Sequence, residues 1–403
     1  MKSLNTSSDY LQQIPTGSVF LQSGVGEDTD MVFTGDICLD QRIGQICFDN
    51  SLDLIFGDLL PVLRKKDFSI ANLECPLTKA NSPIIKTGPN IRAHPMSVKA
   101  LKYGEFDAVT LANNHIMDYG EVGLIDTIKA CEGIKIKTVG AGMSLSEACL
   151  PLVVRIKNST VTILNFAEHE FSIATATKAG ACPLDIVDNY YQIKKAKENS
   201  DIVIVIIHGG NEHYNLPSPR LQKLCRFYAD LGVSAVICHH SHCPSGLEIY
   251  NGVPIFYSLG NFIYDHPNVS YKYWNKSYLL KLTFRKQAVA SINLIPFCQS
   301  VSHGGVKMMT GEKREQFLNE ICQYSITILD AQKLIESWRE YCKSVRYPYL
   351  ASLIGLNRFE KGLLKYNCYP KSFLKKSSLK VVNYFTCEAL RDFAQEILEQ
   401  EYS

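Results

Sequence analysis

Residues 106–120 read FDAVTLANNHIMDYG, and this stretch indicates the fold class. Its first seven residues are mostly apolar or β-branched, which is typical of a buried strand. The strand runs directly into polar residues that include Asn114, His115 and Asp118. Open α/β sheets bind their ligands at the carboxyl ends of strands. The stretch therefore predicts one strand of such a sheet, with reactive side chains at its end.

Helical and strand patterns alternate on both sides of this stretch. Leu124, Ile128 and Cys131 share one face of a helix that Gly133 closes, and residues 221–232 repeat the arrangement. Alternation of this kind predicts an α/β layered domain with mostly parallel pairing, and the closing run 254–295 predicts an antiparallel portion. The runs that predict strands are 31–35, 68–73, 106–112, 161–166, 202–207, 233–238, 254–259 and 278–284.

Five of these strands end in side chains that can bind metal ions. The residues concerned are Asp36, Glu74, Asn114 with its neighbours His115 and Asp118, His208, and the pair His240 and His242. Each has an ordinary structural explanation on its own, as a turn carboxylate, a solvated loop residue, a helix cap or a hydrogen-bonded histidine. Their joint occurrence predicts a site for two metal ions.

The donor types narrow the choice of metal. Imidazole and carboxylate ligands with an amide oxygen suit Mn, Fe or Zn, whereas an all-oxygen shell suits Mg or Ca. A bridging carboxylate can hold two ions about 3.5–4 Å apart and clamp a phosphoryl group between them. The predicted cofactors are therefore two divalent metal ions, and the predicted chemistry is hydrolysis.

Composition excludes several classes of partner. The 403 residues are 46% apolar, and 42 basic against 40 acidic side chains give a net charge of +2, so no overall field attracts nucleic acid. The first residues are polar, and no run approaches the roughly 18 apolar residues of a spanning helix. Fourteen cysteines are scattered along the chain, which favours reduced thiols and a soluble, cytoplasmic protein without a transmembrane segment.

Three regions are predicted along the chain. Residues 1–30 are polar and unpatterned and are expected to form a mobile lead-in. Residues 31–304 form the catalytic domain, and residues 305–403 form a helical accessory region. In that region the positions of Leu334, Trp338, Tyr341 and Cys342 predict an amphipathic helix that docks on the domain, while the lysines of 361–380 are expected to form a solvated face.

The motifs resemble those of the CapA/PgsA-type proteins of capsule and poly-γ-glutamate synthesis, over about residues 31–265. That family's domain looks like a calcineurin-like metallophosphoesterase, so the resemblance implies an α/β/β/α sandwich with a C-terminal helical appendage. The motifs that carry it are TGDICLD (34–40), ANLECPLT (71–78), LANNHIMDYG (111–120), HGG with Glu212 (208–212), ICHHSHCP (237–244) and IFYSLGNFIYD (255–265).

The resemblance also implies a role for each residue. Asp36 and His242 belong to the first metal, and Glu74 bridges the two ions. The second metal takes Asn114, His208 and His240, with His240 preferred over His239 because the H-x-H spacing ends at His242. His115 is implied as a catalytic general acid or electrostatic stabiliser, with the catalytic Asp118 orienting its ring.

Cys38 departs from the family pattern. It stands where the wider superfamily's D-x-H motif has a ligating histidine, two residues after Asp36. A thiolate ligand is one interpretation, and a small buried core residue is the other and favoured one.

The leading functional hypothesis is a metal-dependent hydrolase of capsule, poly-γ-glutamate or surface-polymer metabolism. Its expected partners are an anionic small-molecule or polymer substrate and capsule-synthesis proteins. The alternative is a non-catalytic subunit that uses the same cleft for polymer binding or assembly, but His115 favours catalysis. A dinucleotide-binding enzyme is rejected, because Gly140 and Gly142 form only a short GxG without the expected acidic residue.

Overall fold

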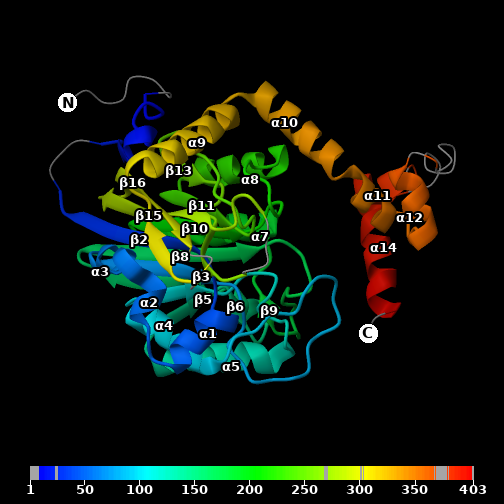
Figure 1. The fold of residues 1–403 in the computed structure, drawn as a ribbon, viewed down its shortest axis with the longest axis horizontal. Coiled ribbons are helices and arrows are strands. Elements are labelled where there is room, and N and C mark those ends of the chain that lie inside the picture. The colour runs from blue at the N-terminus through cyan, green and yellow to red at the C-terminus, as the bar shows by residue number, and fades with distance from the viewer. Residues whose placement is uncertain are drawn as a thin grey trace. The chain divides into compact units, whose positions relative to one another are not determined.

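The computed structural model describes residues 9–22, 26–266, 271–299, 302, 304–366, 368, 379 and 381–401. The chain forms two compact units, one reaching Leu334 and the other beginning at Ile335. Figure 1 shows the first unit as stacked sheets and helices and the second as helices alone. Each unit is described by itself.

The first unit contains two large sheets. One has nine strands in the order β1, β16, β15, β2, β3, β4, β5, with β14 beside β2 and β17 beside β16. Its strands are β1 (Ser18–Phe20), β2 (Asp28–Cys38), β3 (Phe68–Leu73), β4 (Ala108–Thr110), β5 (Lys137–Val139), β14 (Asn261–Tyr264), β15 (Lys276–Arg285), β16 (Ala288–Gln299) and β17 (Val306–Met308).

The other large sheet has six strands in the order β12, β13, β11, β10, β8, β7. They are β7 (Leu152–Ile156), β8 (Ser159–Ala167), β10 (Ile202–His208), β11 (Ala235–His239), β12 (Leu247–Tyr250) and β13 (Val253–Phe256). A separate pair joins β6 (Ala141–Gly142) to β9 (Gly180–Ala181).

The two sheets pack face to face, and helices cover their outer faces. Side chains of β10 show why: Ile202, Ile204 and Ile206 belong to the core between the sheets, whereas Val203, Val205 and Ile207 belong to the core under the helices. A strand with both faces apolar can be buried on both sides. The predicted α/β/β/α arrangement is thus confirmed.

The helices fall into two sets. α7 (Ile186–Asn199) and α8 (Pro219–Asp230) cover the six-stranded sheet. On the nine-stranded sheet lie α1 (Gln41–Phe48), α2 (Asp53–Phe56), α3 (Leu60–Arg64), α4 (Val98–Tyr103) and α5 (Gly120–Gly133). The short helices are α6 (Leu145–Ala148) and the 3-10 turns η1 (Ile14–Thr16), η2 (Gly57–Leu59) and η3 (Pro95–Ser97).

Parallel pairing brings the carboxyl ends of the strands to one edge in each sheet. β2, β3 and β4 are parallel neighbours, and so are β8, β10 and β11. The expected antiparallel portion is also present, since β15 pairs with both β16 and β2 in that sense. This topology places the strand-end residues of both sheets where they can meet.

The N-terminal expectation is wrong for residues 10–20. Tyr10, Ile14 and Val19 are buried, and β1 forms an antiparallel ladder with β16. Their side chains belong to the core between the sheets, and β1 pairs with the edge of β16 that would otherwise be open. The segment is therefore part of the domain and not a lead-in.

The predicted domain boundary at residue 304 also differs from the structure. Helix α9 (Gly311–Leu329) buries Phe317, Leu318 and Ile321 in the core between the sheets. The compact unit consequently extends to Leu334. The sequence pattern after residue 304 becomes helical, but this change of secondary structure is not the end of the domain.

The second unit is helical, as expected. It contains most of α10 (Ala331–Ser344), then α11 (Arg346–Leu353), α12 (Arg358–Lys365) and α14 (Glu388–Glu401). Its small core consists of Ala351, Leu356 and Leu364. Lys361 and Lys365 belong to α12, whereas Lys371, Lys375, Lys376 and Lys380 lie outside the described residues.

Two further observations concern the whole chain. Cys149 forms a disulfide with Cys182, so the expectation of reduced thiols is wrong at this pair, while the other twelve cysteines are free. Among the described residues, every helix is too short or too polar to cross a membrane.

Candidate metal centre

The strand-end side chains of both sheets converge on one buried site. Asp36 lies near the end of β2, Glu74 follows β3, and Asn114 lies in the loop after β4. His208 closes β10, and His240 and His242 follow β11. All six residues are at most 7% exposed. The structure thus brings together all six residues that the sequence analysis assigned to metal binding.

Their donor atoms form two groups that share one carboxylate. Glu74, His208 and His240 make one group, and Asp36, Glu74 and His242 make the other. Within each group the donor atoms lie within 4.8 Å of one another. A shared carboxylate between two donor groups is the arrangement that a two-metal site requires.

Glu74 provides the test of whether the residues fit metal ions. Its side chain is 0% exposed, and neither carboxylate oxygen has a hydrogen-bond partner within the described part of the chain. A buried, unpaired carboxylate is strongly unfavourable unless a cation or a proton compensates it. The donor set of imidazoles, carboxylates and an amide oxygen fits Mn, Fe or Zn.

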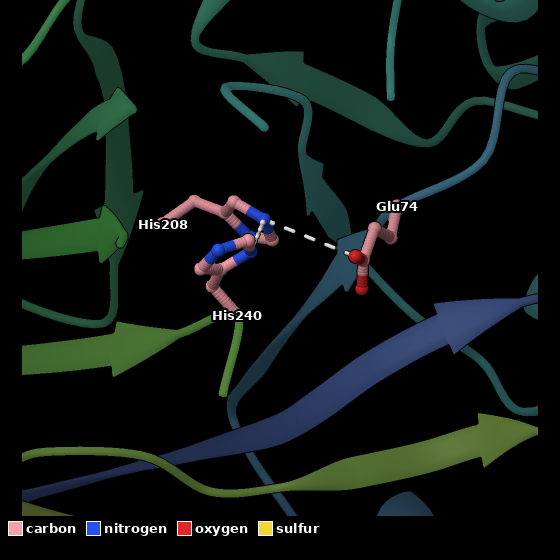
Figure 2. A group of neighbouring side chains, drawn as sticks. All are labelled: Glu74, His208 and His240. Atoms are coloured by element: carbon pink, nitrogen blue, oxygen red, sulfur yellow. Dashed lines mark hydrogen bonds and ion pairs between the residues drawn. The ribbon is translucent and has the colours of Figure 1, made fainter. Parts of the chain in front are cut away.

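Figure 2 shows the first donor group. The rings of His208 and His240 lie close together, and the carboxylate of Glu74 faces them. Nε2 of His208 lies 3.1 Å from Nδ1 of His240 and 3.9 Å from Oε1 of Glu74. The same Nε2 lies 3.0 Å from Oδ1 of Asn114, so the amide oxygen completes this group as a fourth donor.

The second donor group surrounds Asp36. Nδ1 of His242 lies 3.5 Å from Oδ2 of Asp36, and Nε2 of His242 lies 3.5 Å from Oε1 of Glu74. The neighbouring His239 also contacts Asp36, with its Nδ1 3.3 Å from Oδ1 of Asp36. His239 therefore flanks the Asp36 group, and His240 belongs to the other, in agreement with the preferred register.

The electrostatics of the histidines suit metal binding. Burial and the neighbouring His240 hold the pKa of His208 well below its ordinary value. Burial likewise lowers the pKa of His242 to about 4, although Asp36 opposes the shift. Both imidazoles are therefore neutral at neutral pH, which is the form that offers a lone pair to a metal.

The two carboxylates are shifted in opposite directions. Burial and the charge of Asp36 raise the pKa of Glu74 well above its ordinary value. Burial acts to raise the pKa of Asp36 as well, but the interactions with His239 and His242 outweigh it and hold the pKa below the ordinary value. Without metal, Asp36 is thus the ionised partner and Glu74 resists ionisation.

The two residues predicted to be catalytic lie together beside this centre. Nδ1 of His115 lies 2.7 Å from Oδ2 of Asp118, and both side chains are buried. The backbone amide of His115 donates to the side chain of Asn113, which shapes the loop after β4. Asp118 is thus placed to orient the ring of His115, as the resemblance implied.

Several side chains of the site were missed in the sequence. Asn72 donates to Oδ1 of Asp36 at 2.8 Å, and Oδ1 of Asn261 lies 2.9 Å from Nδ1 of His242. Glu170 reaches within 3.7 Å of Nε2 of His240. The SLGNF motif contains Asn261 and offered a signal, whereas nothing in the sequence near Glu170 indicated it. Lys86, on a loop outside every motif, also reaches His115 and Asp118.

Cys38 is not among the metal donors. It is fully buried, its pKa is raised well above the ordinary value by burial and by the adjacent Cys75, and neither donor group includes it. A buried thiol with a raised pKa does not readily form the thiolate that binds metal. The geometry supports the structural interpretation of this residue.

Relatives of this chain carry names from capsule and polymer synthesis. The PGA biosynthesis protein CapA of Bacillus subtilis is 34% identical over 237 residues, which cover 58% of this chain and 62% of that protein. The capsule biosynthesis protein CapA of Bacillus anthracis is 30% identical over 296 residues, covering 70% of each. A probable polyglutamine synthesis accessory protein of Mycobacterium tuberculosis is 30% identical over 278 residues, covering 65% of this chain and 73% of that one.

The family itself is matched across the region that contains the site. Residues 30–266 match the family described as bacterial capsule synthesis protein PGA_cap. These residues include both donor groups and make up more than half of the chain. The chain therefore belongs to the PGA_cap family of bacterial capsule synthesis proteins.

Proposed function

We propose that the chain is a metal-dependent hydrolase that uses a dinuclear site on a phosphoester or an amide-linked polymer in capsule or poly-γ-glutamate metabolism. The observation that supports this most is Glu74, which both donor groups share and whose two buried carboxylate oxygens have no hydrogen-bond partner among the described residues. A buried carboxylate without a hydrogen-bond partner destabilises the folded protein when no metal is bound. Two metal ions, one in each donor group, would compensate its charge.

The residues divide into holding and reacting roles. Asp36, Glu74, Asn114, His208, His240 and His242 would hold two divalent ions, Mn, Fe or Zn. Bound ions in such a site supply Lewis acidity and an activated water. We assign to His115 the exchange of a proton with the leaving group. The contact of its Nδ1 with Asp118 supports this role, because it leaves Nε2 as the reactive nitrogen.

The test begins with metal content. We expect about two metal equivalents per chain by plasma mass spectrometry, and turnover of at least one class in a panel of phosphomonoesters, phosphodiesters and γ-glutamyl amides with Mn, Fe or Zn. His240→Ala and His242→Ala should each lose about one equivalent, because the two histidines belong to different donor groups. His115→Ala should keep both metals and lower turnover by about 10²–10⁴-fold.

A matched control separates the site from general damage. Glu248 is another buried carboxylate, but it lies on β12 at the edge of the six-stranded sheet, pairs with Arg226 and belongs to neither donor group. Glu248→Gln should therefore keep its metals, whereas Glu74→Gln should lose them. If wild-type protein incubated with Mn, Fe or Zn binds no metal, the proposed metal centre is refuted.

The second candidate is a non-catalytic subunit that binds polymer or partner proteins of a capsule-synthesis system. The word "accessory" in the name of the mycobacterial relative favours it. Two bound metals without turnover on any substrate class, together with binding of poly-γ-glutamate that is lost in His240→Ala, would support this candidate over the enzyme.

A further inference from the structure

Lys86 has an unusual environment for a lysine. Its side chain is only 4% exposed, whereas the preceding Ile85 is 97% exposed. This reverses the ordinary preference, because lysine is rarely buried unless it is paired, and isoleucine is usually inside. The loop thus places a charged side chain inside the protein and an apolar one in solvent.

The contacts of Lys86 explain why it is buried. Its Nζ forms an ion pair with Oδ1 of Asp118 and lies 3.2 Å from Nδ1 of His115. The other oxygen of Asp118, Oδ2, lies 2.7 Å from the same Nδ1. The three side chains form a closed group, the Lys86 triad, in which each member contacts the other two.

The loop around Lys86 is fastened to the same aspartate. The amide of Ile84 donates to the backbone oxygen of Asp118 at 3.0 Å, and the amide of Ile91 donates to Oδ2 at 2.7 Å. Asn90 closes the loop by donating its side-chain amide to the oxygen of Ile84. Residues 79–92 contain no helix or strand, so these bonds to Asp118 do much to define the loop's path.

We propose that Lys86 is a positioning residue of the metal centre, which neutralises Asp118 and fixes the ring of His115 through the Lys86 triad. This inference rests on the proposed hydrolytic function and assigns a residue that acts through Asp118 without touching the substrate. Without the ammonium, Asp118 would be a buried carboxylate that the loop amides alone could not compensate.

The charge of Lys86 also bears on the substrate. Asp36 and Glu74 already place carboxylates in the centre, and Glu170 lies at its margin. An uncompensated Asp118 would add another negative charge close to an incoming phosphoryl or carboxylate group. Lys86 removes that repulsion while Asp118 keeps its hold on His115.

Lys86→Met tests the proposal, since it retains the length of the side chain and removes the charge. We expect the downfield proton resonance of the His115–Asp118 hydrogen bond, identified by its absence in His115→Gln, to shift or broaden. Amide exchange at Ile84 and Ile91 should become at least about tenfold faster. Metal content should stay unchanged. The kcat should fall by about 10–100-fold, as for a misplaced catalytic group, and KM should rise because the uncompensated Asp118 repels an anionic substrate.

Lys66→Met is the matched control. Lys66 is also nearly buried, at 7% exposure, and its Nζ lies 3.6 Å from Asp107, but it precedes β3 and so lies at the opposite end of that strand from Glu74. Its substitution should leave the resonance, the exchange at Ile84 and Ile91, and the kinetics unchanged. Equal effects of the two substitutions would overturn the proposal.

A double variant shows whether Lys86 acts through Asp118. In an Asp118→Asn background no buried carboxylate needs a counter-charge, so adding Lys86→Met should cause little further loss. This pair also remains informative if Lys86→Met alone does not fold. A full additional loss in the Asn background, or wild-type behaviour of Lys86→Met, would overturn the role. If wild-type protein hydrolyses nothing while the resonance and exchange respond as expected, the proposed function fails and the Lys86 triad stands.

Discussion

His240 and His242 have a left-handed backbone conformation, which residues other than glycine seldom adopt. Their φ angles are 98° and 54°. Such residues cost of order 1–3 kcal/mol each and persist where the surroundings fix them. The turn after β11 places both imidazoles inward within three residues, so that each can join a different donor group. The strain is located at the metal centre.

Glu74 should make the stability of the metal-free protein depend on pH. A carboxyl whose folded pKa is raised binds its proton more tightly in the native state than in the unfolded chain. Stability is then highest at low pH and falls as pH rises from the ordinary value of 4.5 toward the raised one, by up to about 1.4 kcal/mol per pH unit. Glu74→Gln should remove this component.

Urea unfolding of metal-free wild type and Glu74→Gln across pH 5–8 measures that difference. Saturating metal should abolish the decline in the wild type, because the bound ion replaces the proton. Parallel pH profiles for the two metal-free proteins would contradict the raised pKa of Glu74.

The sequence allowed us to predict the site residues at strand ends, but not those in irregular loops. Asp36, Glu74 and His208 were found because each closes a recognisable apolar run. Lys86 and Glu170 sit in irregular loops, where no periodicity records which way a side chain points. Only the folded chain shows that an exposed-looking lysine is buried against Asp118.

At the scale of elements, the contact between β2 and β14 depends on a glycine. The amide of Asp36 donates to the carbonyl of Gly260 at 3.0 Å. A Cβ on Gly35 would lie only 1.7 Å from that carbonyl oxygen. Close approach of two backbones explains why glycine directly precedes Asp36.

Gly35→Ala should therefore destabilise the protein by about 3 kcal/mol or more, since neither backbone can withdraw without disturbing the sheet. Gly133→Ala is the control, because nothing lies within 4 Å of its Cβ position at the end of α5. It should be neutral or stabilising by up to about 1 kcal/mol. Denaturant midpoints compare the two, and similar values would show that Gly35 is not tightly packed.

Elements with strong apolar runs were predicted well, and short ones were not. Residues 68–73 were predicted as a strand and form β3 with the same bounds. β1 was missed because its three residues carry no period of their own and owe their structure to the ladder with β16. Tertiary pairing, which sequence patterns do not contain, decides such segments.

At the scale of the molecule, α9 belongs to the first compact unit, which contains the candidate metal centre. A chain ending at residue 334 should fold and keep its metals, since the compact unit ends there. A chain ending at residue 304 should unfold or aggregate, because loss of Phe317, Leu318 and Ile321 removes about 1.5–3 kcal/mol of burial apiece. Circular dichroism and metal content distinguish the two, and a folded, metal-loaded 1–304 fragment would show that α9 is dispensable.

The disulfide bears on where the protein works. The sequence has fourteen cysteines, and two are joined as Cys149–Cys182, which leaves twelve thiols. Denatured, unreduced protein should therefore titrate twelve thiols and reduced protein fourteen. Disulfides persist mainly in oxidising compartments. Fourteen thiols before reduction would contradict the bond and agree with the cytoplasmic location expected from the sequence.

The order of strands in the nine-stranded sheet has a consequence for synthesis. β2 is made early, yet its neighbours on one side, β14 and β15, lie beyond residue 260. While the ribosome translates the intervening chain, one edge of β2 stays open, and open edges invite pairing with other chains. Slower translation would lengthen that exposure. That edge is covered only when the β15–β16 hairpin emerges and β15 pairs with β2.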